Sequence, residues 1–280
     1  MWLLASYINY AETKDIKSRD RVYAAATVLA SRFNSKGGYI RSWNDIPGKD
    51  TKRWSIADNM MNLPLLYHAS EITGDPRFAH VATAHATTMS KYLMREDGSS
   101  NHIICFNPET GENEENSETL EYTQGYSTTS AWTRGQAWVL SGFTYCYGHT
   151  KKPEFLEAAK KSARFFLSQL DDSYVVPIDF FAPDKDATDS SAAAIAASGM
   201  LELCKYLDGE EKEFFLSGAK NILLMLDRKF ADYTSATQPI LSGGATRYFG
   251  EGMRDVSLIY GDFYYAEALY KLTGGKTLFA

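Results

Sequence analysis

The chain has 280 residues and a formal net charge of −6; 44% of its residues are hydrophobic and 23% are charged. This balance is typical of a soluble globular protein, and an acidic chain without a dense run of Lys and Arg does not fit a nucleic-acid binder. No apolar run reaches the ~20 residues of a membrane span, and the first residues lack the basic stretch that opens a signal peptide. The three cysteines are far apart and show neither a disulfide framework nor metal-ligand spacing. We therefore expect a cytoplasmic protein with no membrane and no nucleic-acid partner.

Hydrophobic periodicity predicts helices along most of the chain. The predicted helices cover residues 2–12, 18–33, 56–73, 76–95, 131–148, 153–170, 189–207, 210–229 and 256–273. Short strands are expected only near residues 38–43 and 102–106. Long connections rich in Gly, Pro, Asp, Ser and aromatic residues cover residues 37–54, 98–130, 171–188 and 231–254. Structureless connections of this length are usually functional in compact domains.

The predicted helices alternate in character. A helix that is apolar nearly all round ends in a turn, and a helix with Lys and Glu on one face follows, with Phe near its start (Phe78, Phe155 and Phe214). Helices that are apolar all round are buried, and amphipathic helices cover them. The alternation predicts an inner and an outer layer, with the long connections together at one end, where they can line a cleft. An open α-solenoid alternates in the same way, so periodicity leaves both architectures open.

Asp58 stands near the start of the predicted buried helix 56–73. One interpretation is structural, because a carboxylate at a helix start caps the backbone and interacts favourably with the helix dipole. The other is catalytic, because Trp54, Met60, Met61 and Leu63 give the carboxyl group an apolar surround that suits an acid–base residue.

Arg134 and Trp138 share one face of the next buried helix, because they are four residues apart. A guanidinium can bind a carboxylate with two hydrogen bonds, and an indole offers a flat surface for a sugar ring. The alternative is a buried arginine that satisfies a loop carbonyl, with the tryptophan in the core.

His102 and Gln124 lie in the connections, where their side chains can either bind sugar hydroxyls or hold the loops. His68 and His85 fall within helical patterns and are interpreted as core or surface residues rather than ligands. Asp189 is explained as a helix cap. The sequence contains no dinucleotide fingerprint, no GxSxG, no Walker lysine and no Cys/His cluster. We therefore expect no cofactor and no metal.

Taken together, several segments resemble the unsaturated glucuronyl hydrolases of glycoside hydrolase family 88. They occur in the family's order at residues 56–66, 97–111, 123–127, 132–138, 189–199 and 257–265. The resemblance implies one all-α domain over residues 1–280, an (α/α)6 toroid. It also implies a substrate oligosaccharide that carries a 4,5-unsaturated uronic acid at its non-reducing end.

The chemistry implied by the resemblance is hydration of the C4=C5 double bond. Asp58 matches the family's acid–base aspartate, which would protonate C4 and take a proton from the water that adds at C5. The hemiketal formed then opens, and the neighbouring sugar is released. His102, Gln124, Arg134 and Trp138 match sugar-contacting positions, with Arg134 expected at the uronate carboxylate and Trp138 beneath the ring.

The chain also departs from the family pattern. Family members carry a His-Asp pair just before the stretch that matches residues 1–4, so we expect the toroid to be incomplete at its N-terminus. This departure keeps one alternative open, a non-catalytic truncated fragment that binds sugar. A second alternative is the related unsaturated rhamnogalacturonyl hydrolase group, although the segment with Asp58 fits the glucuronyl type better. The sequence makes no prediction of oligomeric state.

Overall fold

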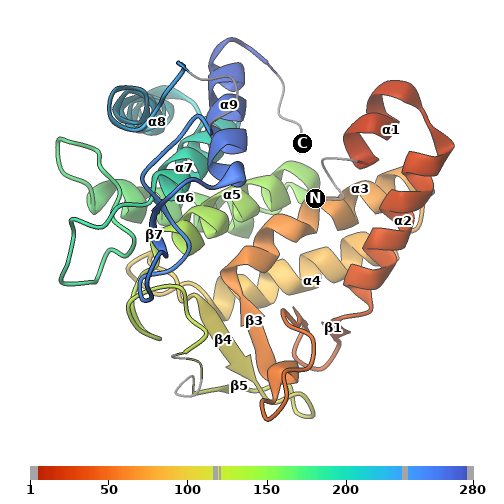
Figure 1. The fold of residues 1–280 in the computed structure, drawn as a ribbon. Coiled ribbons are helices and arrows are strands. Elements are labelled where there is room, and N and C mark those ends of the chain that lie inside the picture. Colours follow the sequence, from red (N-terminus) through yellow and green to blue (C-terminus); the bar gives the residue numbers. More distant parts are fainter. Residues whose placement is uncertain (1–5, 116–118, 120, 235–238, 276–280) are drawn as a thin grey trace.

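The computed structural model describes residues 6–115, 119, 121–234 and 239–275, and helices account for most of them (Figure 1). The α-helices are α1 (Ile8–Thr13), α2 (Ile16–Ala30), α3 (Leu63–Thr73), α4 (Arg77–Tyr92), α5 (Thr133–Thr150), α6 (Pro153–Ser168), α7 (Ser190–Leu203), α8 (Gly209–Lys229) and α9 (Ile259–Leu272). The short 3₁₀ helices within these residues are η2 (Thr51–Arg53), η3 (Ala57–Asn62) and η4 (Cys204–Tyr206). Each helix predicted from periodicity is found, although residues 2–5 of the first prediction lie outside the described residues.

Three small antiparallel sheets lie in the connections. The strands are β1 (Phe33–Asn34), β2 (Tyr39–Ile40), β3 (Trp54–Ile56), β4 (Ile103–Phe106), β5 (Asn113–Glu114), β6 (Gly244–Ala245) and β7 (Arg254–Val256). They pair as β1–β2, β3–β4–β5 and β6–β7. The strand expectations near residues 38–43 and 102–106 are confirmed by β2 and β4. The expectation that strands occur only there is wrong, because β1, β3, β5, β6 and β7 lie outside both regions.

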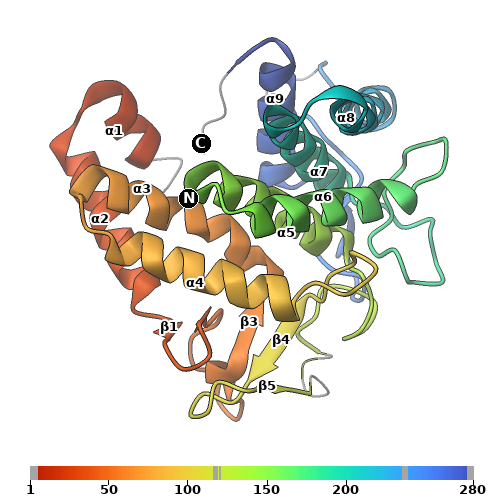
Figure 2. The same cartoon turned by 180° about the vertical axis from the view of Figure 1, so that it is seen from behind.

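The helices form two layers. All residues of α7, and those of α5 from Thr133 to Cys146, are buried. By contrast α4, α6 and α8 bury one face each. The inner helices contact one another in chain order, α3 with α5, α5 with α7 and α7 with α9, and α4 and α6 lie over them on the side seen in Figure 2. The predicted alternation of buried and covering helices is therefore confirmed for α3 to α8. The expectation that the last helix is also buried nearly all round is wrong, because α9 buries one face and exposes Ile259 and Tyr270.

Glycines let the inner helices approach closely. A Cβ atom on Gly142 of α5 would collide with Met60 of η3, and one on Gly199 of α7 would collide with Ser141 of α5. Only glycine, which has no Cβ atom, lets the backbone at these two positions approach the neighbouring side chains so closely. These contacts hold the inner helices side by side. Their N-terminal ends lie together, because Arg134 at the start of α5 pairs with Asp189 at the start of α7, and Gly261 near the start of α9 packs against Ser191.

The connections meet at that same end through their backbones. The loop before α5 pairs with the loop before α7 at Trp132 and Asp179, and Tyr248 N donates to Gln124 O at 2.7 Å. The expectation that the long connections gather at one end is confirmed. Within the described residues, no helix combines the length and apolar character needed to cross a bilayer.

Candidate active site

Asp58 and His102 are brought together by the β3–β4 ladder. Ile56 at the end of β3 is opposite Ile103 at the start of β4, and Ala57 N donates to His102 O at 2.9 Å. Since the strands are antiparallel, residues just after one strand and just before the other are neighbours. The Asp58 Oδ2 and His102 Nε2 atoms are 3.6 Å apart.

The Asp58 side chain does not act as a helix cap. The cap positions of η3 and α3 are Ile56 and Asn62, and neither element has a side-chain cap hydrogen bond. The capping interpretation of Asp58 is therefore wrong, whereas the helix-dipole interpretation is not contradicted, because Asp58 lies in the first turn of η3. Its side chain is 33% exposed, yet Oδ2 is buried and has no hydrogen-bond partner among the described residues. This oxygen is available for a ligand.

The tautomer of His102 follows from its other ring nitrogen. Gln124 N–H donates to His102 Nδ1 at 3.1 Å, so Nδ1 is an acceptor. A neutral imidazole with an acceptor at Nδ1 carries its proton on Nε2, the atom that faces Asp58. The Nε2–H group is buried and, like Asp58 Oδ2, has no hydrogen-bond partner in the described part of the chain. A hydrogen-bond donor and a carboxylate oxygen thus lie 3.6 Å apart, and neither has another partner among the described residues.

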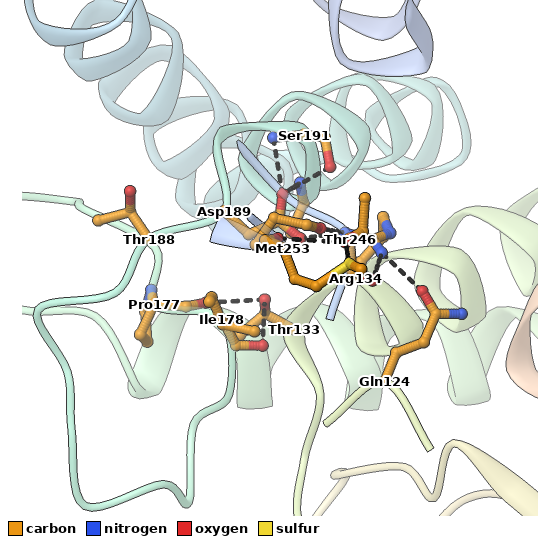
Figure 3. Close-up of polar contacts among 12 residues, drawn as sticks. Gln124, Thr133, Arg134, Pro177, Ile178, Thr188, Asp189, Ser191, Thr246 and Met253 are labelled. Carbon is orange, nitrogen blue, oxygen red and sulfur yellow. Dashed lines mark hydrogen bonds and ion pairs between the residues drawn. The ribbon is translucent and has the colours of Figure 1, made fainter. Parts of the chain in front are cut away.

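Arg134 joins the side chains and loops of a neighbouring polar network through four hydrogen bonds and ion-pair contacts (Figure 3). Its guanidinium pairs with Asp189 and donates to the carbonyl of Ala245 through Nη1. Through Nη2 it donates to Gln124 Oε1 and to the carbonyl of Thr246, both at 2.8 Å. Arg134 is 2% exposed. The interpretation that a buried arginine satisfies loop carbonyls is confirmed, and contact with a substrate carboxylate stays a prediction.

Asp189 has two roles at the start of α7. Its Oδ1 accepts from the backbone of Ser191 and Ala192, which confirms the predicted cap. Its Oδ2 pairs with Arg134, which the sequence did not predict. The same carboxylate therefore fixes a helix start and holds the guanidinium between three loops.

Trp138, one turn after Arg134 on α5, lies among tyrosines of α9. Its ring centroid is 5.5 Å from that of Tyr264 and 6.1 Å from that of Tyr260. The indole is only 8% exposed, so most of its surface is already packed. Its predicted role beneath a sugar ring is neither confirmed nor contradicted by this packing.

Tyr260 links the two halves of the site, and the sequence analysis missed it. Burial raises its pKa, Arg134 lowers it, and the charges of Asp189 and Asp58 raise it. The charges of all three groups therefore act on the Tyr260 hydroxyl. The Arg134 guanidinium carbon lies 5.5 Å from the centre of the Tyr260 ring. Gln124 also lies between His102 and Arg134, because its backbone N–H donates to His102 and its Oε1 accepts from Arg134. The residues are thus near one another, and their roles in a site stay predictions.

Two further buried residues were missed. The Trp132 ring lies 4.5 Å from the His102 ring and 4.4 Å from the Arg134 guanidinium carbon. Asp179 is fully buried and accepts hydrogen bonds from Ser130 Oγ and from the backbone of Tyr126, which shapes the loop that carries Gln124. Trp132 stands in the segment that carries Arg134, which was a usable signal; nothing near Asp179 in the sequence marks it.

Comparison with known proteins shows to which family the sequence is similar. Residues 2–176 match the model of Glycosyl Hydrolase Family 88. The chain is 35% identical, over 99% of its length and 74% of the relative's, to an unsaturated glucuronyl hydrolase of Bacillus sp. strain GL1. It is 34% identical, over 92% of its length and 65% of the relative's, to an unsaturated chondroitin disaccharide hydrolase of Streptococcus pyogenes.

The fold agrees with this match. The crystal structure of the Bacillus sp. GL1 unsaturated glucuronyl hydrolase superposes with a TM-score of 0.90 at 34% identity, covering 97% of this chain and 72% of that one. The two layers of helices are thus those of an (α/α)6 barrel, as predicted. The chain belongs to glycoside hydrolase family 88.

Proposed function

We propose that the protein hydrates the C4=C5 double bond of an unsaturated uronic acid at the non-reducing end of an oligosaccharide, and so releases that sugar. The observation that carries the proposal is the pair formed by Asp58 Oδ2 and His102 Nε2, both buried and both without a hydrogen-bond partner among the described residues. The relatives named above, an unsaturated glucuronyl hydrolase and unsaturated chondroitin disaccharide hydrolase, support the substrate class.

The reaction needs one carboxyl group for two proton transfers. Protonated Asp58 delivers its proton to C4, and the ring oxygen on C5 stabilises the positive charge that develops there. The Asp58 carboxylate then takes a proton from a water molecule as that water adds to C5, which restores the carboxyl group. The C5 hemiketal opens to a ketone, and the neighbouring sugar leaves from C1. Transfers by a positioned group of this kind are worth roughly 10²–10⁴-fold in rate.

His102 and Gln124 orient the reactants in this proposal. The Nε2–H group of His102 points at the space beside Asp58, where it donates to the carboxylate or to the sugar. The Gln124 amide is oriented by Arg134: a guanidinium only donates, so Oε1 must face it and the NH₂ group is left to donate to a sugar hydroxyl.

Arg134 acts mainly as a positioning residue. Its four contacts with Asp189, Gln124, Ala245 and Thr246 occupy both terminal nitrogens. Direct binding of a uronate carboxylate would require some of these contacts to be exchanged. We propose instead that the guanidinium holds Gln124 and the loop with Ala245 in place, and that Trp138 and Tyr260 form the wall behind the sugar.

The proposal is tested by following the ultraviolet absorbance of the unsaturated bond in a lyase-produced chondroitin disaccharide. The absorbance should fall in step with release of the second sugar, and a saturated disaccharide should not be cleaved. Turnover only of an unsaturated rhamnogalacturonyl disaccharide would select that alternative. A folded protein with no turnover of either would indicate a non-catalytic fragment.

A further inference from the structure

A second cluster of polar side chains lies at the other end of the inner helices. His68 and Glu71 are one turn apart near the end of α3, and His149 is in the last turn of α5. His68 Nδ1 lies 2.8 Å from Glu71 Oε2, and His149 Nδ1 lies 3.0 Å from Glu71 Oε1. One carboxylate therefore joins two imidazoles from different helices.

Aromatic rings hold both imidazoles in fixed orientations. Tyr7 stacks on His68 with ring centroids 3.7 Å apart, and Tyr67 stacks on His149 with centroids 4.7 Å apart. The two histidine side chains are 2% and 7% exposed, whereas the Glu71 side chain is 53% exposed. The cluster is thus rigid on the protein side and open to solvent at its carboxylate.

The Glu71 carboxylate is the charged member of the cluster. Partial burial raises its pKa, but hydrogen bonds from His149 and His68 outweigh burial and bring the pKa to about 2. Glu71 thus offers carboxylate oxygens beside two imidazoles that offer nitrogen ligands. Two imidazoles and a carboxylate with an open position form the ligand set of many zinc and iron sites.

We propose that His68, Glu71 and His149 bind one divalent transition-metal ion, of the Zn²⁺ or Co²⁺ type, with water completing its coordination. One ligand atom from each residue already lies within 4.8 Å of the other two. Tetrahedral bonds of ~2.0–2.1 Å to zinc place ligand atoms about 3.4 Å apart. The present His–Glu separations of 2.8 and 3.0 Å need to widen by only a few tenths of an ångström, which exposed Glu71 allows. The two imidazole nitrogens, within 4.8 Å of each other, need to reach the same ~3.4 Å separation.

Binding exchanges hydrogen bonds for metal bonds. In the metal-free cluster the Nδ1 atom of each imidazole is hydrogen-bonded to Glu71; in the bound form the Nδ1 lone pairs face the ion, and the ring proton is on Nε2. The ion joins the ends of α3 and α5, so it stabilises the fold. His149 is fifteen residues from Arg134 on α5, about 22 Å along the helix, so this site is independent of the proposed active site. The proposal departs from the sequence-based expectation that the protein binds no metal and that His68 is not a ligand.

The test uses the full chain after removal of metals with EDTA and dialysis. Titration calorimetry with Zn²⁺ should give one ion per chain, and Co²⁺ should produce an intense visible absorption typical of four-coordinate nitrogen and oxygen ligation. His149→Gln and Glu71→Gln should each weaken Zn²⁺ binding more than about 10-fold, a loss that even outer-shell changes can cause. His80→Gln, at an exposed histidine of α4, is the matched control and should bind as the wild type does.

The thermal midpoint provides a second measurement. Zn²⁺ should raise the midpoint of the wild type and of His80→Gln but not that of Glu71→Gln. The Glu71 side chain is 53% exposed, so this variant should still fold. Absence of the Co²⁺ band in the wild type, or equal loss of binding in His80→Gln and His149→Gln, would overturn the proposal and leave a hydrogen-bonded cluster without a metal.

Discussion

The Nε2 atom of His102 lies 3.6 Å from Oδ2 of Asp58, and the β3–β4 ladder sets this separation. Backbone pairing places the two side chains, so their geometry does not depend on a flexible loop. The other ring nitrogen of His102 is fixed by Gln124 N–H. The proposed proton donor and its neighbour are therefore held in register by main-chain hydrogen bonds.

Replacing His102 by Gln should lower kcat by about 10- to 100-fold, the loss expected when a reacting group is misplaced by about 1 Å. The reason is that Asp58 and the sugar lose the fixed Nε2–H donor. The measurement is steady-state absorbance loss on the chondroitin disaccharide, with circular dichroism to verify the fold. A kcat within twofold of the wild type would exclude His102 from the mechanism.

Breaking the Arg134–Asp189 pair should destabilise the protein. Arg134 is 2% exposed and Asp189 is fully buried, so removing one partner leaves a buried charge. Arg134→Met and Asp189→Asn should each lower the free energy of unfolding by about 3–5 kcal/mol, measured by urea denaturation. The variant with both substitutions should lose less free energy of unfolding than the two single variants lose together, because it leaves no unpaired buried charge. If either single variant lost only ~0–1 kcal/mol of unfolding free energy, as exposed ion pairs do, the pair would not act as a buried one.

A second buried charge cluster joins α7 and α9. Lys271 Nζ lies 3.2 Å from Glu267 and 3.5 Å from Glu202, and all three side chains are at most 2% exposed. Lys271→Met removes the shared cation and should lower the free energy of unfolding by about 3–5 kcal/mol. Calorimetry should show a matching fall in the thermal midpoint. Adding Glu267→Gln should recover part of the loss; a further additive loss would show that the two side chains are not coupled.

His85 should make stability depend on pH. It is buried, its Nδ1 accepts from Ile40 N–H, and burial lowers its pKa to about 3. The unfolded histidine titrates near pH 6.5, so below that pH the unfolded state binds a proton that the folded state refuses. The free energy of unfolding should fall by about 1.4 kcal/mol from pH 7.5 to 5.5 through this residue alone.

His85→Gln retains a hydrogen-bond acceptor for Ile40 N–H but cannot bind a proton, so it should lose the ~1.4 kcal/mol fall in the free energy of unfolding. His80→Gln should still show that fall. Urea denaturation at the two pH values measures the difference. Glu71, with its pKa lowered to about 2, contributes stability that is lost only as pH falls below its ordinary range near 4.5, outside this window. Equal pH dependence in the wild type and His85→Gln would contradict the assignment.

Hydrophobic periodicity predicted which helices are buried, because helices such as α5 and α7 are apolar nearly all round, but it left the choice between a toroid and an open solenoid to the family resemblance. It did not predict β3, and it predicted one helix over residues 56–73 where the structure has the 3₁₀ helix η3 followed by α3. The predicted neighbourhood of His102 and Arg134 rests on Trp132, whose ring contacts both side chains.

The remaining site residues depend on contacts distant in the chain. Asp179 acts on the loop of Gln124 only after residues 171–188 fold over α5, and no local pattern marks it. The same holds for Asp189, whose cap role was readable from sequence but whose ion pair with Arg134 requires two helices to meet. His68 and His149 likewise meet only because α3 packs against α5.

The most direct test of the central claim is the rate of absorbance loss with Asp58→Asn, compared with Asp75→Asn in the α3–α4 turn. The account predicts that Asp58→Asn slows turnover by roughly 10²–10⁴-fold or more, with disaccharide binding retained in calorimetry and Asp75→Asn equal to the wild type. An Asp58→Asn variant that turns over the disaccharide within tenfold of the wild type would contradict it.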